Sequence, residues 1–322
     1  MSSIIKPEIE KRILQLEEKF KNSGQDLGSY LDGLLYDRYL TYWDYIHLDT
    51  LLSLQVPKTH FPDELIFITY HQATELYFKL ILHEIQQIVD QKALSAEFYI
   101  KKLKRINRYA TVLIHSFEVM IKGMEKEQFL QFRMSLLPAS GFQSVQFRMI
   151  EIYATSMRNL VHEPLRESID DDTSLEKVYE QLYWKFGSTN PDSGEKTVTL
   201  KQFEKRYTPR LLRIASQVES SNLNALYLGM SEEERNNREL ISELKDFDKN
   251  FNVKWLLKHM GAAYRYLNQA ETKVFATGGT NWKKYLPPSF QKIQFFPQLW
   301  DASENENWGK PEVLDSLSHS TV

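Results

Sequence analysis

The chain contains no cysteine. Disulfides, cysteine-ligated zinc, iron–sulfur clusters, thiolate-ligated haem and cysteine nucleophiles are therefore excluded. Any metal chemistry must rest on the 8 histidines and on the carboxylates. Glycine and proline are also scarce, with 12 and 11 of the 322 residues, and together they make up about 7% against roughly 12% in average proteins. Because so few residues favour tight turns, we expect long helices.

An excess of charge and long apolar runs are lacking as well. Lys and Arg number 40, Asp and Glu 43, and the net charge of −3 gives no electrostatic reason to bind nucleic acid or a membrane surface. No apolar stretch reaches the length that spans a bilayer, and the N-terminus lacks the apolar core of a signal peptide. We therefore expect a cytoplasmic protein that does not enter membranes.

Helical periodicity dominates the sequence. Apolar residues recur at helical spacing from Ile9 to Phe20, which predicts an amphipathic N-terminal helix within residues 1–24. Further helices are predicted over residues 63–91, 95–122, 144–160, 200–218, 231–246 and 252–271. No segment alternates with period two for long enough to form a sheet. The sequence predicts a single all-α domain over residues 1–322, with a surface loop at 184–199 and a mobile tail at 302–322.

The common catalytic motifs are absent. There is no GxGxxG, P-loop, HExxH or GxSxG, and no Glu-x-x-His pair of the di-iron kind. Single side chains carry the remaining signals. His71 lies within a predicted helix, with Phe67 and Glu75 one turn away on the same face. His259 follows Trp255 by one turn and precedes small residues that would let a flat macrocycle approach.

Each of these signals also has an ordinary structural explanation. A histidine within an apolar helix is more often structural than catalytic, and small residues also permit close helix packing. Arg133, beside Phe129 and Phe132, could hold a carboxylate in its guanidinium fork, or it could be a solvated arginine at a helix end. Thr277 lies in a Thr-Gly-Gly-Thr turn that offers a hydroxyl and backbone N–H groups to an anion, or that is a plain glycine turn.

Six segments in collinear order resemble the tryptophan 2,3-dioxygenase family. They are LTYWDYIHLDTLLSLQ from Leu40, DELIFITYHQATELYFKLILHE from Asp63, FRMSLLPASGFQSVQFRMIE from Phe132, WLLKHM from Trp255, ATGGT from Ala276 and FFPQLWD from Phe295. The resemblance implies an all-helical homotetramer with one haem b per subunit, ferrous when active. It also implies that O₂ opens the indole ring of L-tryptophan to give N-formyl-L-kynurenine, the first step of the kynurenine pathway.

The resemblance assigns roles to single residues. His259 matches the axial ligand of the haem iron, and His71 matches the distal histidine that hydrogen-bonds the indole N–H. Phe67 matches the aromatic residue packed against the substrate ring. Arg133 matches the arginine that grips the substrate carboxylate, and Thr277 the threonine that contacts the ammonium group.

Other positions match residues at the edge of the pocket. Tyr42, Tyr45 and Ile46 align with pocket residues that a neighbouring subunit contributes, so the oligomer would complete the site. Phe129 stands where some bacterial members have a tyrosine whose hydroxyl helps to bind the carboxylate. Loss of that donor would weaken substrate binding by roughly 1–2 kcal/mol without changing the reaction.

Two alternatives remain beside this interpretation. A haem enzyme of similar build could act on another indole or aromatic amino acid, although the matches at His71, Phe67 and Arg133 speak against it. A helical haem-binding protein without turnover is the second alternative. Such a descendant would be expected to have lost Arg133 or His71, and this chain has kept both.

Overall fold

The computed structural model describes residues 5–36, 40–136, 143–170, 172–190, 193–267 and 287–312. Helices account for all the regular structure of these residues, which contain no β-strand and only two isolated bridges. The predicted all-α fold is confirmed. No helix in these ranges combines the length and apolar character needed to cross a membrane. By its internal contacts the chain divides into two units, Met1–Val56 and Pro57–Val322.

In the first unit, residues 5–36 and 40–56 form four helices. They are α1 (Pro7–Asn22), α2 (Leu27–Tyr36), α3 (Tyr42–Tyr45) and α4 (Leu48–Leu52). The predicted N-terminal helix is therefore present as α1, which has a proline in its first turn, acidic residues near its start and lysines near its end. No residue of α1 is buried, and Ile9 and Leu14 are 50% and 60% exposed. The apolar stripe of α1 is thus largely uncovered within its own unit.

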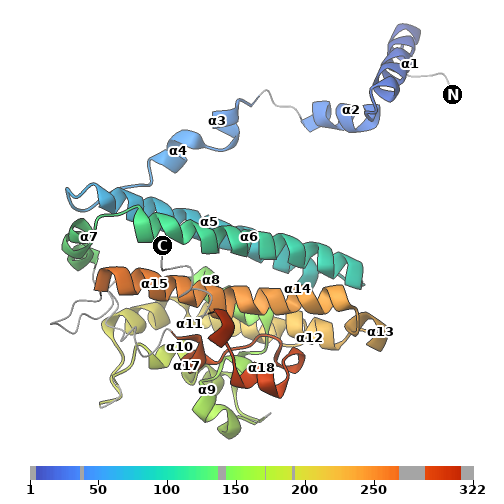
Figure 1. Ribbon diagram of the computed structural model, residues 1–322. Helices are drawn as coiled ribbons and strands as arrows, with labels where there is room; N and C mark the ends of the chain where they lie inside the picture. Colours follow the sequence, from blue (N-terminus) through green and yellow to red (C-terminus); the bar gives the residue numbers. More distant parts are fainter. Residues whose placement is uncertain are drawn as a thin grey trace. The chain divides into compact units, whose positions relative to one another are not determined.

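Two long helices, α5 (Asp63–Val89) and α6 (Ala96–Lys122), lie side by side in the second unit (Figure 1). Ser95 caps α6 by accepting a hydrogen bond from the Phe98 N–H. Apolar side chains spaced three or four residues apart meet between the helices, and Ile85 and Leu103 are fully buried there. These two helices provide the rigid frame on which the histidine of α5 is placed.

A second rod consists of α14 (Arg238–Lys249) and α15 (Trp255–Leu267), which follow one another in line (Figure 1). Both helices pack against α6. The segment η5 (Asn250–Lys254) between them is a π turn, with one more residue per turn than an α-helix. The helix predicted over residues 231–246 is divided into α13 (Glu232–Arg235) and α14, and the one predicted over 252–271 corresponds to the end of η5 and to α15 as far as Leu267, beyond which residues 268–271 lie outside the described residues. The gap that the prediction left between the two helices is helical in the structure.

Shorter elements fill the rest of the second unit. They are α7 (Lys126–Phe132), η1 (Arg133–Leu136), α8 (Val145–Ala154), η3 (Met157–Leu160), η4 (Glu163–Ser168), α9 (Leu175–Glu180), α10 (Tyr183–Phe186), α11 (Val198–Val218), α12 (Leu223–Leu228), α13 (Glu232–Arg235), α17 (Pro288–Gln291), η6 (Pro297–Leu299) and α18 (Ala302–Glu306). The helix predicted over residues 144–160 ends at Ala154, because Thr155 is extended and Ser156 caps a separate 3-10 turn.

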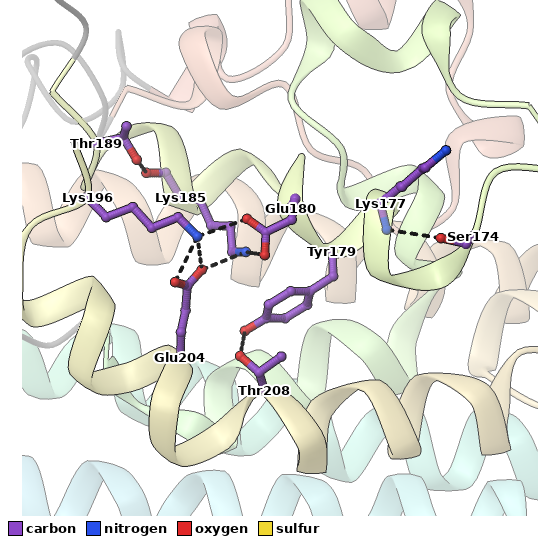
Figure 2. Close-up of polar contacts among 9 residues, drawn as sticks. All are labelled: Ser174, Lys177, Tyr179, Glu180, Lys185, Thr189, Lys196, Glu204 and Thr208. Atoms are coloured by element: carbon purple, nitrogen blue, oxygen red, sulfur yellow. Dashed lines mark hydrogen bonds and ion pairs between the residues drawn. The ribbon is translucent and has the colours of Figure 1, made fainter. Parts of the chain in front are cut away.

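The predicted surface loop at residues 184–199 is wrong at its beginning. Lys185 lies in the helical turn α10, and its side chain is only 3% exposed. Its ammonium group lies 3.0 Å from a Glu180 oxygen and 2.7 Å from a Glu204 oxygen, and Lys196 binds the same two carboxylates (Figure 2). Two lysines and two glutamates thus balance one another, which allows a charged residue to be buried.

The predicted mobile tail at residues 302–322 is also wrong in its first part. Asp301 and Glu304 form a capping box that starts α18. Trp308 is only 5% exposed and packs edge-on against Trp300, with 4.9 Å between the ring centres. Residues 302–312 are therefore part of the packed structure, while residues 313–322 lie outside the described residues.

Candidate active site

The two histidines singled out from the sequence lie on different helices and face a common aromatic wall. The ring of His71 on α5 lies 5.6 Å from that of Tyr70, and Tyr70 lies 5.8 Å from Phe117 of α6. Phe117 in turn lies 4.6 Å from His259 of α15. The histidines are close enough for a charge on His71 to lower the pKa of His259.

The tautomer of His71 follows from its own helix. The Nδ1 atom lies 2.7 Å from the carbonyl oxygen of Phe67. A carbonyl only accepts hydrogen bonds, so Nδ1 carries the proton and Nε2 keeps a free lone pair. Burial lowers the pKa of His71 below its ordinary value, opposed by the bond to Phe67 and by the carboxylate of Glu75. His71 therefore presents a neutral acceptor, which suits a ligand with one N–H donor.

His259 is arranged in the same way. Its Nδ1 atom lies 3.1 Å from the carbonyl oxygen of Trp255, so its Nε2 also keeps a lone pair. Burial lowers the pKa of His259 to about 4, which keeps the imidazole neutral at physiological pH. The rings of Phe117 and Trp255 pack at 4.6 and 4.8 Å and hold it in place. A neutral, oriented imidazole is the form that binds a transition metal.

The surroundings of His259 fit a haem group. Ala262 and Ala263, one turn further along α15, are partly buried against the core, and each adds only a methyl group to this side of the helix. Across the described ranges, no group of three or more His, Cys, Asp or Glu side chains could hold a metal ion by itself. The lone pair on Nε2 of His259 is the kind of ligand that holds the iron in histidine-ligated haem proteins.

An aromatic box lies beside His71. The ring of Phe67 is 4.1 Å from His71, and those of Phe132 and Phe129 are 5.7 and 6.2 Å from Phe67. The short helix α7 presents Phe129 and Phe132 three residues apart, on one face. Tyr266 of α15 packs at 4.6 Å against Phe129 and donates its hydroxyl to the backbone of α6. The aromatic box of Phe67, Phe129 and Phe132 is therefore apolar, and the imidazole of His71 lies at its edge.

Arg133 adds a positive charge next to this box. It follows Phe132 directly, at the start of η1, and it is only 6% exposed. Burial lowers the pKa of Arg133, but an arginine remains charged because its ordinary pKa is so high. A buried guanidinium suits a ligand carboxylate, which it can bind through two parallel hydrogen bonds. Phe129 contributes ring surface here and no hydroxyl.

Four predicted site residues are not part of this assembly. Thr277 lies outside the described residues. Tyr42, Tyr45 and Ile46 belong to the first unit, on α3 and directly after it. The two tyrosines are 70% and 74% exposed there. The roles of all four residues therefore stay predictions.

Sequence reasoning missed four rings of the site, and one of them, Tyr70, directly precedes His71 in the chain. Phe132 was noticed only as a neighbour of Arg133, although its spacing from Phe129 already places both rings on one helix face. Phe117 and Tyr266 carried no signal at all. Each is one apolar position among many on its helix, and its importance comes from contacts between helices that are distant in the sequence.

The described residues form a helical protein in which His71 and His259, both neutral, lie beside the shared rings of Tyr70 and Phe117. Residues 36–176 match the family model of tryptophan 2,3-dioxygenase. A tryptophan 2,3-dioxygenase of Herpetosiphon aurantiacus is 30% identical over 267 residues, which cover 81% of this chain and 96% of the relative.

Two further relatives carry the same name. The enzyme of Bacillus thuringiensis subsp. konkukian is 28% identical over 277 residues, covering 82% of this chain and 91% of the relative. The enzyme of Myxococcus xanthus is 28% identical over 276 residues, covering 81% and 88%. The chain belongs to the tryptophan 2,3-dioxygenase family.

Proposed function

We propose that this protein, loaded with haem, opens the indole ring of L-tryptophan with O₂ to give N-formyl-L-kynurenine. The observation that carries the proposal is a pair of neutral histidines joined by ring contacts, with His71 against Tyr70 and His259 against Phe117. His71 and His259 both use Nδ1 to bond their own helix, which leaves both Nε2 atoms available. We assign the Nε2 atom of His259 to the iron of the haem and the Nε2 atom of His71 to the indole N–H of the substrate.

Haem, when bound, supplies the activation of O₂. The residues of the chain bind and orient what reacts with it. His259 holds the iron through Nε2, and the box of Phe67, Phe129 and Phe132 takes up the indole ring. His71 accepts the hydrogen bond of the indole N–H. This bond aligns the reacting carbons of the ring, and alignment is where a fixed contact accelerates a reaction most.

His71 acts by orientation rather than by removing a proton. The indole N–H is a very weak acid, and the lowered pKa of His71 makes its Nε2 a weaker base than an ordinary histidine. A hydrogen bond from the N–H to Nε2 needs no proton transfer. It does require the neutral tautomer that the Phe67 carbonyl fixes.

Arg133 selects for the amino-acid part of the substrate. Its guanidinium is buried beside Phe132 and carries a planar fork of N–H donors that matches the two oxygens of a carboxylate. A substrate carboxylate can accept two parallel hydrogen bonds from this fork, whereas an indole without a carboxylate cannot. The site therefore favours tryptophan over tryptamine.

The assembly is a homotetramer in which a neighbouring subunit completes the site. Tyr42 and Tyr45 are exposed on the first unit and so are available to another copy of the chain. On the second unit, Leu65, Leu76 and Val119 are 47%, 50% and 45% exposed on the outer faces of α5 and α6. Large apolar side chains gathered in this way are typical of subunit contacts. Placement in the cytoplasm stays a prediction.

Complementation tests the shared site. A variant with both Tyr42→Ala and Tyr45→Ala, unfolded and refolded together with His259→Ala, would form mixed tetramers. Some sites would then combine an intact His259 with intact tyrosines from a neighbour, so activity should return above that of either variant alone. Failure to recover activity in mixtures that sediment as tetramers would contradict a site shared between subunits.

The reaction itself is tested by following absorbance. The haem-loaded protein is reduced with dithionite, mixed with L-tryptophan without oxygen, and then exposed to O₂. The near-ultraviolet band of N-formylkynurenine should appear on exposure. A Soret shift with tryptophan but no product would indicate another substrate, and a protein that does not bind haem would refute the proposal.

A further inference from the structure

The π turn η5 sets the direction in which α15 presents His259. Phe247 and His259 are twelve residues apart, which in an uninterrupted α-helix places them about 120° apart around the axis. The additional residue of the π turn removes about 100° of this angle and leaves about 20°. Phe247 and His259 therefore lie on nearly the same face of the rod.

Ring contacts along the rod agree with this register. Phe247 packs against Phe251 at 4.8 Å, and Trp255 packs against His259 at 4.8 Å. Phe147 of α8 touches both Phe251 and Trp255, at 6.1 and 6.3 Å. One continuous aromatic face thus runs through the π turn and ends at His259.

Asp248 ties this turn to a distant part of the chain. It is completely buried, and its two carboxylate oxygens accept four hydrogen bonds from neutral donors. Oδ1 accepts from the Asn252 side chain at 2.7 Å and from the Phe295 N–H at 2.9 Å. Oδ2 accepts from the Phe296 N–H at 3.2 Å and from the Trp300 indole at 2.9 Å. Asn252 belongs to the π turn itself.

A second set of polar contacts holds the other side of the turn. Asn250, 4% exposed, donates its side-chain amide to Asn107 of α6 at 3.3 Å. Asn107 donates in turn to the backbone and the side chain of Glu243 on α14, at 2.9 and 2.8 Å. The turn is therefore fixed from α6, from α14 and from the segment after residue 294.

We propose that Asp248 is a positioning residue for His259, because it locks the π turn that aims the imidazole. This inference rests on the proposed role of His259 as the iron ligand. A carboxylate buried without a cation in contact is costly to keep. A simple apolar filler would suffice if the position only had to be packed. The four hydrogen bonds that Asp248 accepts join the π turn, through Asn252, to the segment Phe295–Trp300, and an apolar residue could accept none of them.

The test compares three variants of the full-length, haem-loaded chain. Asp248→Asn keeps the shape but replaces one acceptor oxygen with an NH₂ group that faces N–H donors. Trp300→Phe keeps a ring and removes one of the four hydrogen bonds. Asp246→Asn, on an exposed position of the same helix, is the matched control. The readouts are the iron–histidine stretching band of the ferrous protein by resonance Raman, the rate of haem transfer to apomyoglobin, and the melting temperature.

Asp248→Asn should broaden or shift the iron–histidine band and speed haem loss by roughly tenfold. Trp300→Phe should act in the same direction by about threefold, and Asp246→Asn should match the unchanged protein. A wild-type band and wild-type haem loss in both buried variants, with only a lower melting temperature, would overturn the inference. If Asp248→Asn does not fold, Trp300→Phe decides by the same criteria. If His259→Ala kept haem and the same band, the ligand assignment would have failed instead.

Discussion

The hydrogen bond from the indole N–H to His71 makes a prediction that a change of substrate can isolate. In His71→Ala the acceptor Nε2 is removed, and 1-methyl-L-tryptophan lacks the donor. The unchanged enzyme should prefer L-tryptophan over 1-methyl-L-tryptophan. The methylated compound cannot donate a hydrogen bond to His71, and its methyl group collides with the imidazole of His71. In His71→Ala there is no bond to lose and more space for the methyl group.

The geometry around His71, together with the general cost of an unmade hydrogen bond, gives the expected change in substrate preference. The Phe67 carbonyl, 2.7 Å from Nδ1, fixes Nε2 as an acceptor, and the Phe67 ring at 4.1 Å prevents the imidazole from turning away. A buried donor left without its partner costs about 1–3 kcal/mol. The ratio of kcat/KM for the two substrates should therefore fall by about 5- to 150-fold in His71→Ala.

Steady-state kinetics with both substrates measures this ratio directly. Tyr70→Phe is the matched control. It keeps the aromatic ring next to His71 and removes only the Tyr70 hydroxyl, which lies 3.4 Å from the Ser116 hydroxyl. That variant should keep the wild-type ratio. An unchanged ratio in His71→Ala, with an overall loss of rate, would refute the hydrogen bond and leave His71 another role.

Three further predictions address other parts of the site. Arg133→Leu should lower kcat/KM for L-tryptophan on the order of a hundredfold, equivalent to about 3 kcal/mol of activation free energy, but hardly change kcat/KM for tryptamine. Equal losses of kcat/KM for the two substrates would contradict a carboxylate contact. His259→Ala should lose haem on gel filtration while circular dichroism still shows the full helix content, and full haem retention would disprove the ligand assignment. Burial raises the pKa of Asp248 from 3.8 to about 6. Its contribution to stability is therefore complete below pH 3.8 and is lost as the pH rises through 6, by on the order of 3 kcal/mol. We expect urea unfolding of the haem-free protein to show a free energy of unfolding that falls between pH 4 and 7 relative to that of Asp248→Asn. Parallel plots of this free energy against pH for the two proteins would contradict the prediction.

The long helices were predictable from the sequence. Apolar periodicity and a serine cap place α5 and α6 within two residues of their observed ends. The same reasoning could not detect the π turn before α15. One additional residue changes the register without changing the local composition, so the pattern still reads as a helix on both sides.

Buried charged residues were the other source of error. Lys185 lies in a polar stretch and looks like part of a surface loop, but the carboxylates that allow its burial are Glu180 and Glu204. Glu204 belongs to a helix beyond the loop. Asp248 is hidden for the same reason, since its donors come from Phe295 to Trp300. Such contacts depend on the tertiary fold.

The site was recognised through resemblance rather than through spacing. No local pattern joins His71 to His259, and only the packing of α5, α6 and α15 brings both onto one aromatic wall. The aromatic box is different in this respect. Phe67 and His71 are one turn apart on α5, and Phe129 and Phe132 are one turn apart on α7, so each pair could be predicted from the sequence. That the two pairs meet could not be predicted.

The central claim is that both oxygen atoms of one O₂ molecule enter the opened indole ring. The most direct test is a single set of turnovers by the reduced, haem-loaded protein with L-tryptophan under ¹⁸O₂, followed by mass spectrometry of the product. We expect N-formyl-L-kynurenine that carries two labelled oxygen atoms. Product with one labelled oxygen, or haem-loaded protein that forms no ring-opened product, would contradict it.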